Sequence, residues 1–339
     1  MSKDEFLILY PVCKVVKGAR RGMICDLQNL SYHLVPNSLI DIIERMSTIP
    51  INQLYEEIDL GQKNILDDYI NFIVSKRLGF ITPNPESFPL LNSIFEYPSK
   101  VSNAIIAIDD HSKHDYNLIF SELSILNCKG LELRFLNSPS QKELFDILTI
   151  SQNTRIQSID LVIKSNSFLT TSFFMHLTSR FRRLNYIHVH SAAQDKEIEI
   201  EENYSFLRYT SKRVLDHSFC GWISEKNFSP NLTLFSESTQ YNNCLNKKIS
   251  IDEHGKIKNC PSMTKEYGEH GNVSLIEVID NKDFHELWGI TKDQVETCNV
   301  CEFRYICIDC RAYRNTKSIT SKPSKCAYNP YLAQWENQN

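Results

Sequence analysis

The residues best suited to chemistry are cysteines gathered in the C-terminal part of the chain. Seven of the eleven cysteines lie between residues 244 and 326, and Gly255 stands between the first two. The seven are Cys244, Cys260, Cys298, Cys301, Cys307, Cys310 and Cys326. Short pairs let two thiolates reach one metal centre from a single turn, whereas distant cysteines must be brought in by the fold. This spacing indicates an iron–sulfur or zinc site.

Three uses of these thiols can be compared. A secreted disulfide scaffold needs an export signal, and the first residues, MSKDEFLILYPV, lack the charged, apolar and small pattern of one. No stretch approaches the roughly 18 apolar residues of a membrane helix, so we expect a cytoplasmic protein with reduced thiols. Zinc ribbons usually separate their cysteine pairs by about 12 to 20 residues, but only five residues lie between Cys301 and Cys307. The crowding favours iron–sulfur chemistry, with structural zinc as the alternative.

The order of the cysteines resembles the SPASM domain, the C-terminal auxiliary-cluster module of peptide-modifying radical SAM enzymes. That family ends its run with three residues between the last two cysteines, where Cys307 and Cys310 have two. The resemblance implies that Cys298, Cys301, Cys307 and Cys326 hold one [4Fe–4S] cluster. It also implies that Cys244, Cys260 and Cys310 hold part of a second.

Three thiolates leave one iron of the second cluster without a protein ligand. The family usually supplies a cysteine a few residues upstream of the first one, but residues 235–243 contain none. The nearest candidate is Cys220, within HSFCGW, where Gly221 lets the backbone approach a metal. The alternative is a buried free cysteine between two aromatic residues. His217 is a further candidate ligand, although a lone histidine more often has an ordinary structural role.

Length and composition bound the elements that must position these residues. A chain of 339 residues suggests two or three domains, and its 42% apolar content suffices for substantial cores. The net charge of −4 gives no general attraction to nucleic acid. Hydrophobic periods change near residues 95 and 210, so we expect domains over 1–95, 96–210 and 211–339.

The first domain opens with strand-like runs and continues with three helical patterns. The apolar runs occupy residues 6–10, 12–16 and 23–27. Helical spacing begins with Asn37 as the predicted N-cap, continues over 51–58, and ends with a helix over 64–78 that Gly79 stops. Strands followed by three helices predict a winged-helix-like fold.

A winged helix often binds DNA, but acids outnumber bases between residues 51 and 80, which does not suit a phosphate backbone. The domain instead resembles the precursor-peptide recognition element of pathways that modify ribosomally made peptides. In that family the leader peptide adds as a strand to the sheet edge and packs against the third helix. The resemblance implies a groove lined by Leu9, Val12, Ile24, Tyr69, Phe72 and Ile73. Each of these is alternatively a plain core residue.

The middle domain alternates strands and helices. Apolar or β-branched runs occupy 104–108, 130–136, 159–164 and 186–190, with helical segments such as 117–126 and 144–149 between them. Strands at about 25-residue intervals predict βα units with a parallel sheet.

In radical SAM enzymes the corresponding region is a partial βα barrel, whose first strand is followed by C-x3-C-x2-C. Here the loop from Asp109 to Tyr116 has no cysteine, and the second strand is followed by LNSP in place of a glycine-rich turn for SAM. Three thiolates are needed to hold the cluster that cleaves SAM. We therefore predict a degenerate barrel that binds no SAM and does no radical SAM chemistry.

Two sets of polar residues in this domain have ligand-type side chains. The loop offers Asp109, His111, His114 and Asp115, although an ordinary solvated loop is the simpler interpretation. His188 and His190 alternate on a strand and share one face, either as a functional pair or as ordinary strand-end residues.

Together, the three domains resemble the SPASM-domain peptide maturases of grasp-with-spasm systems, which are encoded beside an ATP-grasp ligase and a short precursor peptide. The resemblance implies an α/β protein with one or two [4Fe–4S] clusters, whose partners are the leader of that precursor and the ligase. We expect the chain to bind the leader and present the peptide for maturation, with no nucleic-acid or membrane partner. One alternative is an enzyme that uses an open auxiliary cluster on the peptide, and another is a structural zinc scaffold.

Overall fold

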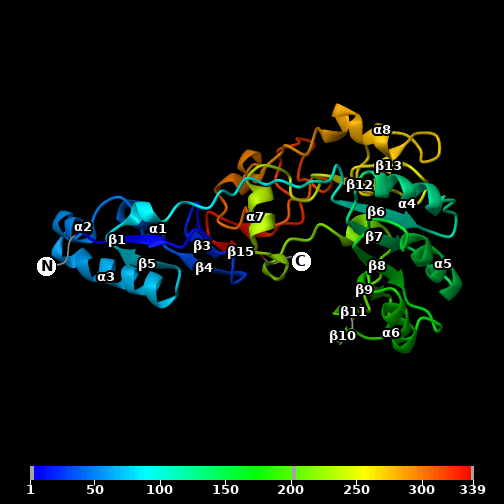
Figure 1. Cartoon of the computed structure of the whole chain (residues 1–339), viewed down its shortest axis with the longest axis horizontal. Coiled ribbons are helices and arrows are strands. Elements are labelled where there is room, and N and C mark those ends of the chain that lie inside the picture. The colour runs from blue at the N-terminus through cyan, green and yellow to red at the C-terminus, as the bar shows by residue number, and fades with distance from the viewer. Residues whose placement is uncertain (1–3, 201–203, 337–339) are drawn as a thin grey trace.

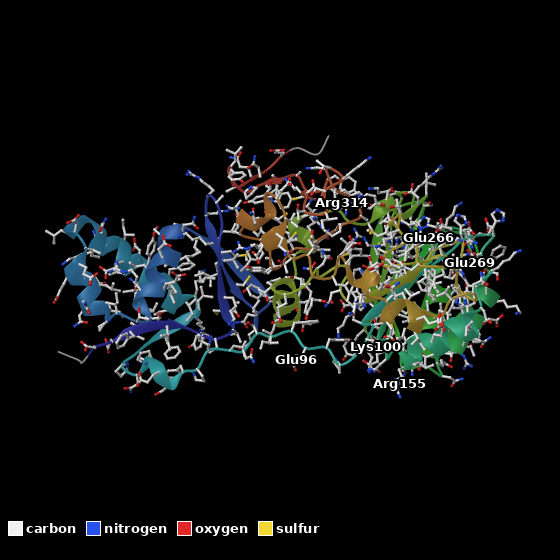
Figure 2. The ribbon with its side chains drawn as sticks, turned by 90° about the horizontal axis from the view of Figure 1, so that it is seen from above. Glu96, Lys100, Arg155, Glu266, Glu269 and Arg314 are labelled. Carbon is white, nitrogen blue, oxygen red and sulfur yellow. The ribbon has the colours of Figure 1, made fainter. Side chains whose placement is uncertain are left out.

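The computed structural model describes residues 4–200 and 204–336. The molecule is elongated: the N-terminal unit lies at one end, a large sheet with its helices at the other, and the cysteine-rich segment between them (Figure 1). An extended connection with no helix or strand leads from the N-terminal unit to the large sheet, and Figure 2 labels Glu96 and Lys100 along it. No helix in the described part of the chain is long and apolar enough to cross a membrane.

The N-terminal unit contains two small sheets and three helices. Strands β2 (Cys13–Lys17), β3 (Gly22–Asp26) and β4 (Ser31–Val35) form an antiparallel sheet in that order, and β1 (Phe6–Leu9) pairs with β5 (Gly79–Thr82). The helices are α1 (Asn37–Met46), α2 (Ile51–Glu57) and α3 (Leu60–Ser75). The expected order of strands and then three helices is present, and β4 is an additional strand.

Strand β3 is buried along its whole length because both faces of its sheet are covered. Side chains alternate between the two faces of a strand. Ile24 lies in a core with α1 and α3, whereas Met23 and Cys25 lie in a second core with the C-terminal segment. The three-stranded sheet therefore separates two cores, one with α1 and α3 and one with the C-terminal segment.

Three local expectations for this unit were wrong. Asn37 is not an N-cap: the cap is Pro36, and the Asn37 side-chain amide donates to the Gly18 carbonyl at 2.9 Å. The third helix begins at Leu60 and ends at Ser75, before Arg77 adopts a left-handed φ of 55°. Gly79 instead begins β5, where a Cβ would lie 2.3 Å from the Ile8 carbonyl oxygen.

The large sheet has eight strands in the order β10-β11-β9-β8-β7-β6-β12-β13. Its centre is the expected parallel array of β6 (Asn103–Ile108), β7 (Gly130–Phe135), β8 (Ser158–Lys164) and β9 (Leu184–His190). Each margin ends in an antiparallel pair, β10 (Lys196–Ile200) with β11 (Ser205–Tyr209), and β12 (Lys248–Ile251) with β13 (Ile257–Lys258). The chain is thus a mixed α/β protein with a mostly parallel sheet.

The sheet does not stop at the expected boundary near residue 210. Strand β12 pairs in parallel with β6, so the hairpin between Cys244 and Cys260 belongs to the large sheet. The cysteine-rich segment is therefore joined to the sheet by backbone hydrogen bonds as well as by packing.

One face of the large sheet packs on helices and the other carries polar residues. The helices are α4 (Tyr116–Ile125), α5 (Gln141–Ser151), α6 (Thr171–Arg180) and α8 (Leu275–Asp280), and their apolar residues share one core with the strands (Figure 1). Because side chains alternate along a strand, Leu131, Leu133 and Phe135 of β7 enter this core, while Glu132 and Arg134 take the other face. We call the face with Glu132, Arg134, Asp160 and His188 the polar face.

Two short helical elements lie between the β12–β13 hairpin and Trp288. Helix α8 ends at Asp280, and a 3₁₀ turn over Lys282–His285 precedes Trp288. A further short helix, α7 (Leu232–Ser238), leads into the stretch that carries Cys244.

Candidate metal centre

Eight cysteines between residues 220 and 326 fall into two groups: the pKa of Cys298 is raised by burial and by its neighbours Cys307 and Cys326, and the pKa of Cys244 by burial and by its neighbours Cys260, Cys310 and Cys220. The first group is Cys298, Cys301, Cys307 and Cys326, and the second is Cys220, Cys244, Cys260 and Cys310. All cysteines are free of disulfide bonds throughout the described residues. Reduced thiols in sets of four, half of them buried and half partly exposed, are a donor set that suits iron–sulfur clusters or zinc. Coordination itself stays a prediction.

The first group is built mainly from consecutive turns. Cys298 opens a 3₁₀ turn over Cys298–Val300, and the Cys301 amide donates to the Cys298 carbonyl at 3.0 Å. Cys326 comes from a later segment that bridges to Ile223. Lys292 is 4% exposed and donates to the Ile308 carbonyl at 3.0 Å, beside the Cys307 thiol. Burial alone lowers the Lys292 pKa, yet Cys307 and Cys298 raise it above its ordinary value.

The second group is built by the large sheet. The β12–β13 hairpin starts after Cys244 and ends before Cys260, so its pairing brings these two thiols together. The Lys248 ammonium lies 3.7 Å from the Cys244 sulfur. Gly221 has a φ of 83°, and a Cβ there would lie 2.9 Å from the Cys310 sulfur. A glycine at this position therefore permits both the turn and the approach of that thiol.

Each group has thiols whose acidity is suppressed. Burial, followed by thiol neighbours in its own group, raises the pKa of Cys244 to about 12, while Lys248 opposes the rise. Burial likewise raises the pKa of Cys298 to about 12, against the effect of Lys292. Such thiols are protonated at neutral pH unless a cation binds, and a coordinated thiol is deprotonated outright. Each group thus pairs four thiols with one lysine, the half-buried Lys248 or the buried Lys292, that stabilises negative sulfur.

No three His, Cys, Asp or Glu side chains within the described ranges converge in an arrangement for a single metal ion. The two groups are accordingly neighbourhoods of thiols.

The polar side chains of the loop after β6 make local hydrogen bonds. Asp109 accepts from the His111 amide at 2.8 Å, and Asp115 caps α4 by accepting from the Leu118 amide at 3.1 Å. His114 places Nε2 2.8 Å from the Ala107 carbonyl. These contacts favour the solvated-loop interpretation.

His188, His190 and His217, which the sequence singled out, also make contacts within the protein. His188 Nε2 lies 2.8 Å from the Thr210 hydroxyl, and burial together with His190 lowers the His188 pKa to about 4. His190 is fully buried and accepts from the Val214 amide at 3.3 Å. Both ring nitrogens of His217 have partners, Arg134 and Glu253. Each of the three therefore makes a structural contact through at least one ring nitrogen, and His217 does so through both.

The six expected leader-binding residues all pack in the N-terminal core, but they do not line one groove. Ile24 and Ile73 are fully buried, so they present no surface for a peptide. Phe72 is partly buried and meets His33 of the edge strand β4 edge to face, with ring centroids 5.8 Å apart. Leu9 instead lines a separate groove of about 700 Å³ on the side of β1 and β2. Val12 and Tyr69 are partly buried, and neither lines that groove.

The N-terminal unit is docked directly on the first cysteine group. The turn between β2 and β3 donates from the Ala19 amide to the Val300 carbonyl at 2.7 Å. Arg21 Nε donates to Glu302 Oε1 at 2.8 Å, and the Glu302 side chain has no exposed surface. Tyr328 also donates to Glu302. A fixed connection therefore runs from the three-stranded sheet to the residues beside Cys301.

Sequence reasoning did not single out Lys248, Lys292, Arg21 or Arg134. Only the two lysines have a local signal in the sequence that could have found them. Lys248 begins an apolar strand, and Lys292 lies six residues before Cys298. Their partners are distant in sequence, so no local pattern shows which contacts they make.

Comparisons with known proteins give only distant similarity. No family model matches the chain, and no curated protein matches it. Among solved structures, Streptococcus suis SuiB bound to S-adenosylmethionine is 10% identical, with a TM-score of 0.37 over 97% of this chain and 100% of that one. SuiB bound to precursor peptide SuiA is 9% identical, with a TM-score of 0.39 over 94% of this chain and 99% of that one. This similarity is too low to assign a family or an activity.

Proposed function

We propose that this chain binds the leader of a ribosomally made precursor peptide and supports its maturation together with an ATP-grasp ligase. In this proposal residues 1–95 are a winged-helix-like recognition element, 96–210 a degenerate radical-SAM-like domain, and 211–339 a SPASM domain with two [4Fe–4S] clusters. The observation that carries the proposal is the separation of eight thiols into two groups of four, one of which adjoins the docked N-terminal unit.

The residues divide the work as follows. The leader adds as a strand to the free edge of β4 and contacts Phe72 of α3, so backbone hydrogen bonds supply affinity and the aromatic contact supplies register. The contacts of Ala19 and Arg21 keep that edge in a fixed position relative to the cysteine-rich segment. Cys298, Cys301, Cys307 and Cys326 hold one cluster, and Cys244, Cys260, Cys310 and Cys220 hold the other. A bound cluster with four thiolate ligands would supply a redox centre.

Two other functions use the same residues. An enzyme with an open iron needs the second group to lack a fourth thiol, and the position of Cys220 beside Cys260 and Cys310 argues against this. A zinc scaffold would use the same two groups of thiols, with zinc in place of iron and sulfide. Both are outcomes of the same metal analysis.

That analysis tests the cluster part of the proposal. Protein purified without oxygen is expected to contain about eight iron and eight sulfide ions per chain. Cys128→Ser is the control for cysteine variants of the two groups. It should leave the iron content unchanged, because Cys128 is a fully buried thiol in the sheet core and belongs to neither group. Zinc without iron would contradict the cluster hypotheses and favour the scaffold.

Leader binding is tested by fluorescence polarisation with the labelled leader of the precursor encoded beside this chain. Binding is expected at about micromolar Kd or tighter, and Phe72→Asp should weaken it at least about tenfold by placing a charge against the added strand. Val74→Asp puts the same charge on a 43% exposed position of α3 and should leave binding unchanged. Absence of binding to the unaltered protein would refute leader recognition.

The second partner is tested separately, by co-elution of this chain with the ATP-grasp ligase on gel filtration.

A further inference from the structure

Arg134 is a buried cation on the polar face of the large sheet. Its residue is 2% exposed, and its Nε donates to Glu132 Oε1 at 2.7 Å from the same strand. A guanidinium is costly to bury unless its donors have partners. Glu132 accepts a hydrogen bond from Nε of the guanidinium. The contacts of the other guanidinium atoms therefore indicate the structural role of Arg134.

The remaining contacts all go to the segment that carries Cys220. Arg134 Nη1 lies 3.2 Å from His217 Nδ1, and the guanidinium carbon lies 4.7 Å from the centroid of the Phe219 ring. Arginine has donors and no acceptor, so Nδ1 of His217 accepts. Nε2 then carries the proton and donates to Glu253 at 2.9 Å. A continuous chain of polar contacts thus ties β7 to this segment and to the β12–β13 turn.

The C-terminal part of the chain holds the same segment from another direction. Lys325 Nζ donates to the Cys220 carbonyl at 2.8 Å and also to the Ser218 carbonyl. It lies 3.6 Å from the centroid of the Tyr313 ring and 5.3 Å from that of Trp222. Cys220 therefore lies in a segment fixed by two cations, one from the sheet and one from the residue that precedes Cys326.

We infer that Arg134 is a positioning residue that holds Cys220 in the second cysteine group, so that this group is complete only when its segment is docked on the sheet. The inference rests on the proposed function only for what the four thiols bind. The positioning of Cys220 is a property of the protein without metal. In cluster-loaded protein, the same contacts would make Cys220 the fourth thiolate of the second group.

The positioning is tested first on metal-free protein by the rate at which iodoacetamide alkylates each cysteine, followed by peptide mass spectrometry. Arg134→Met should speed alkylation of Cys220 by about tenfold or more, as expected when opening of the segment loses hydrogen bonds to a charged group. The rate at Cys298, in the other group, should not change. Arg134→Lys keeps the charge and should restore part of the protection. An unchanged Cys220 rate would overturn the inference.

Two controls separate positioning from general damage. Arg208→Met removes another arginine from the same sheet, one that is half-exposed and pairs with Glu197 at 3.4 Å, and should leave the Cys220 rate unchanged. Phe219→Leu and His217→Gln loosen the contact from the segment side, so they decide the question if Arg134→Met does not fold. Each should expose Cys220 selectively.

The second readout is the electron paramagnetic resonance spectrum of reduced, cluster-loaded protein. Arg134→Met should alter one of the two cluster signals as Cys220→Ser does, and the double variant should add nothing, because both changes act through one ligand. A wild-type spectrum in Arg134→Met would overturn the inference. Absence of iron from the unaltered protein would instead refute the proposed function, and the alkylation rates would then decide the role of Arg134.

Discussion

The two cysteine groups differ in how the chain assembles them. Three members of the first group lie within residues 298–307, and a 3₁₀ turn sets the first pair. The second group takes one cysteine from each of four separate segments, and the β12–β13 hairpin of the large sheet must form before Cys244 and Cys260 meet. One group is therefore specified by local turns and the other by tertiary structure. We therefore expect different substitutions to disrupt the two groups.

Removing two ligands from either group should have the largest effect. Cys298→Ser with Cys307→Ser, and separately Cys244→Ser with Cys260→Ser, should each leave about four of about eight iron ions per chain. Only the first pair should also loosen the N-terminal unit, because Cys307 packs in the core that contains Met23 and Cys25. Iron analysis and limited proteolysis of the connection near Glu96 measure the two effects. Equal proteolysis of both variants would show that the groups are not mechanically distinct.

The docking of the N-terminal unit on the first group should depend strongly on Arg21. Arg21→Ala leaves the buried Glu302 carboxylate without its cation, and we expect a loss of about 2 to 3 kcal/mol in the free energy of unfolding. Denaturant titration measures it. Arg20→Ala removes a neighbouring exposed arginine and should change stability by less than about 0.5 kcal/mol. A similar loss in both variants would argue against a specific ion pair.

The second group should be sensitive to the glycine beside it. Gly221→Ala combines a positive φ with a Cβ placed 2.9 Å from the Cys310 sulfur, and should cost about 2 kcal/mol. Gly271→Ala has a φ of 91° and nothing within 4 Å of its Cβ, so it should cost only the backbone part, about 1 kcal/mol. Thermal unfolding of the two variants isolates the contact with the thiol. Equal costs would mean that Cys310 has room to move.

The smallest effect is expected at the connection between the two regions. Lys100 Nζ lies 2.6 Å from Asp280 on α8, but both side chains are 57% exposed, so Lys100→Ala should cost about 0.5 kcal/mol or less. The cost should shrink further in high salt. A loss above about 1 kcal/mol in the denaturant midpoint analysis would reveal a larger role for this connection.

Local features of the fold could be predicted from the sequence, and long-range pairings could not. The central strands are β-branched runs at regular intervals, which predicted the parallel sheet. Strand β10 reads KEIEI, a short charged edge strand with little apolar signal, and it was missed. The pairing of β12 with β6 joins residues more than 140 positions apart, such as Lys248 and Asn103, and no local pattern reports it.

The candidate site shows the same division. The spacing of Cys298 and Cys301 marked the first group directly, whereas the position of Cys220 depends on Arg134 and Lys325, which come from opposite sides of it in the chain. Ile24 was expected on a peptide-binding surface. It is core because α1 and α3 cover its face of the small sheet.

The covered second face of the three-stranded sheet also bears on how the protein unfolds and how it can be divided. A fragment that ends at residue 95 would carry Val16, Met23, Cys25 and Leu27 on a face that the intact chain covers with Phe303 and Tyr328. Exposed apolar patches of this kind promote self-association. The N-terminal unit should therefore melt together with the cysteine-rich segment, and leader-binding measurements on the isolated unit would report an aggregation-prone species.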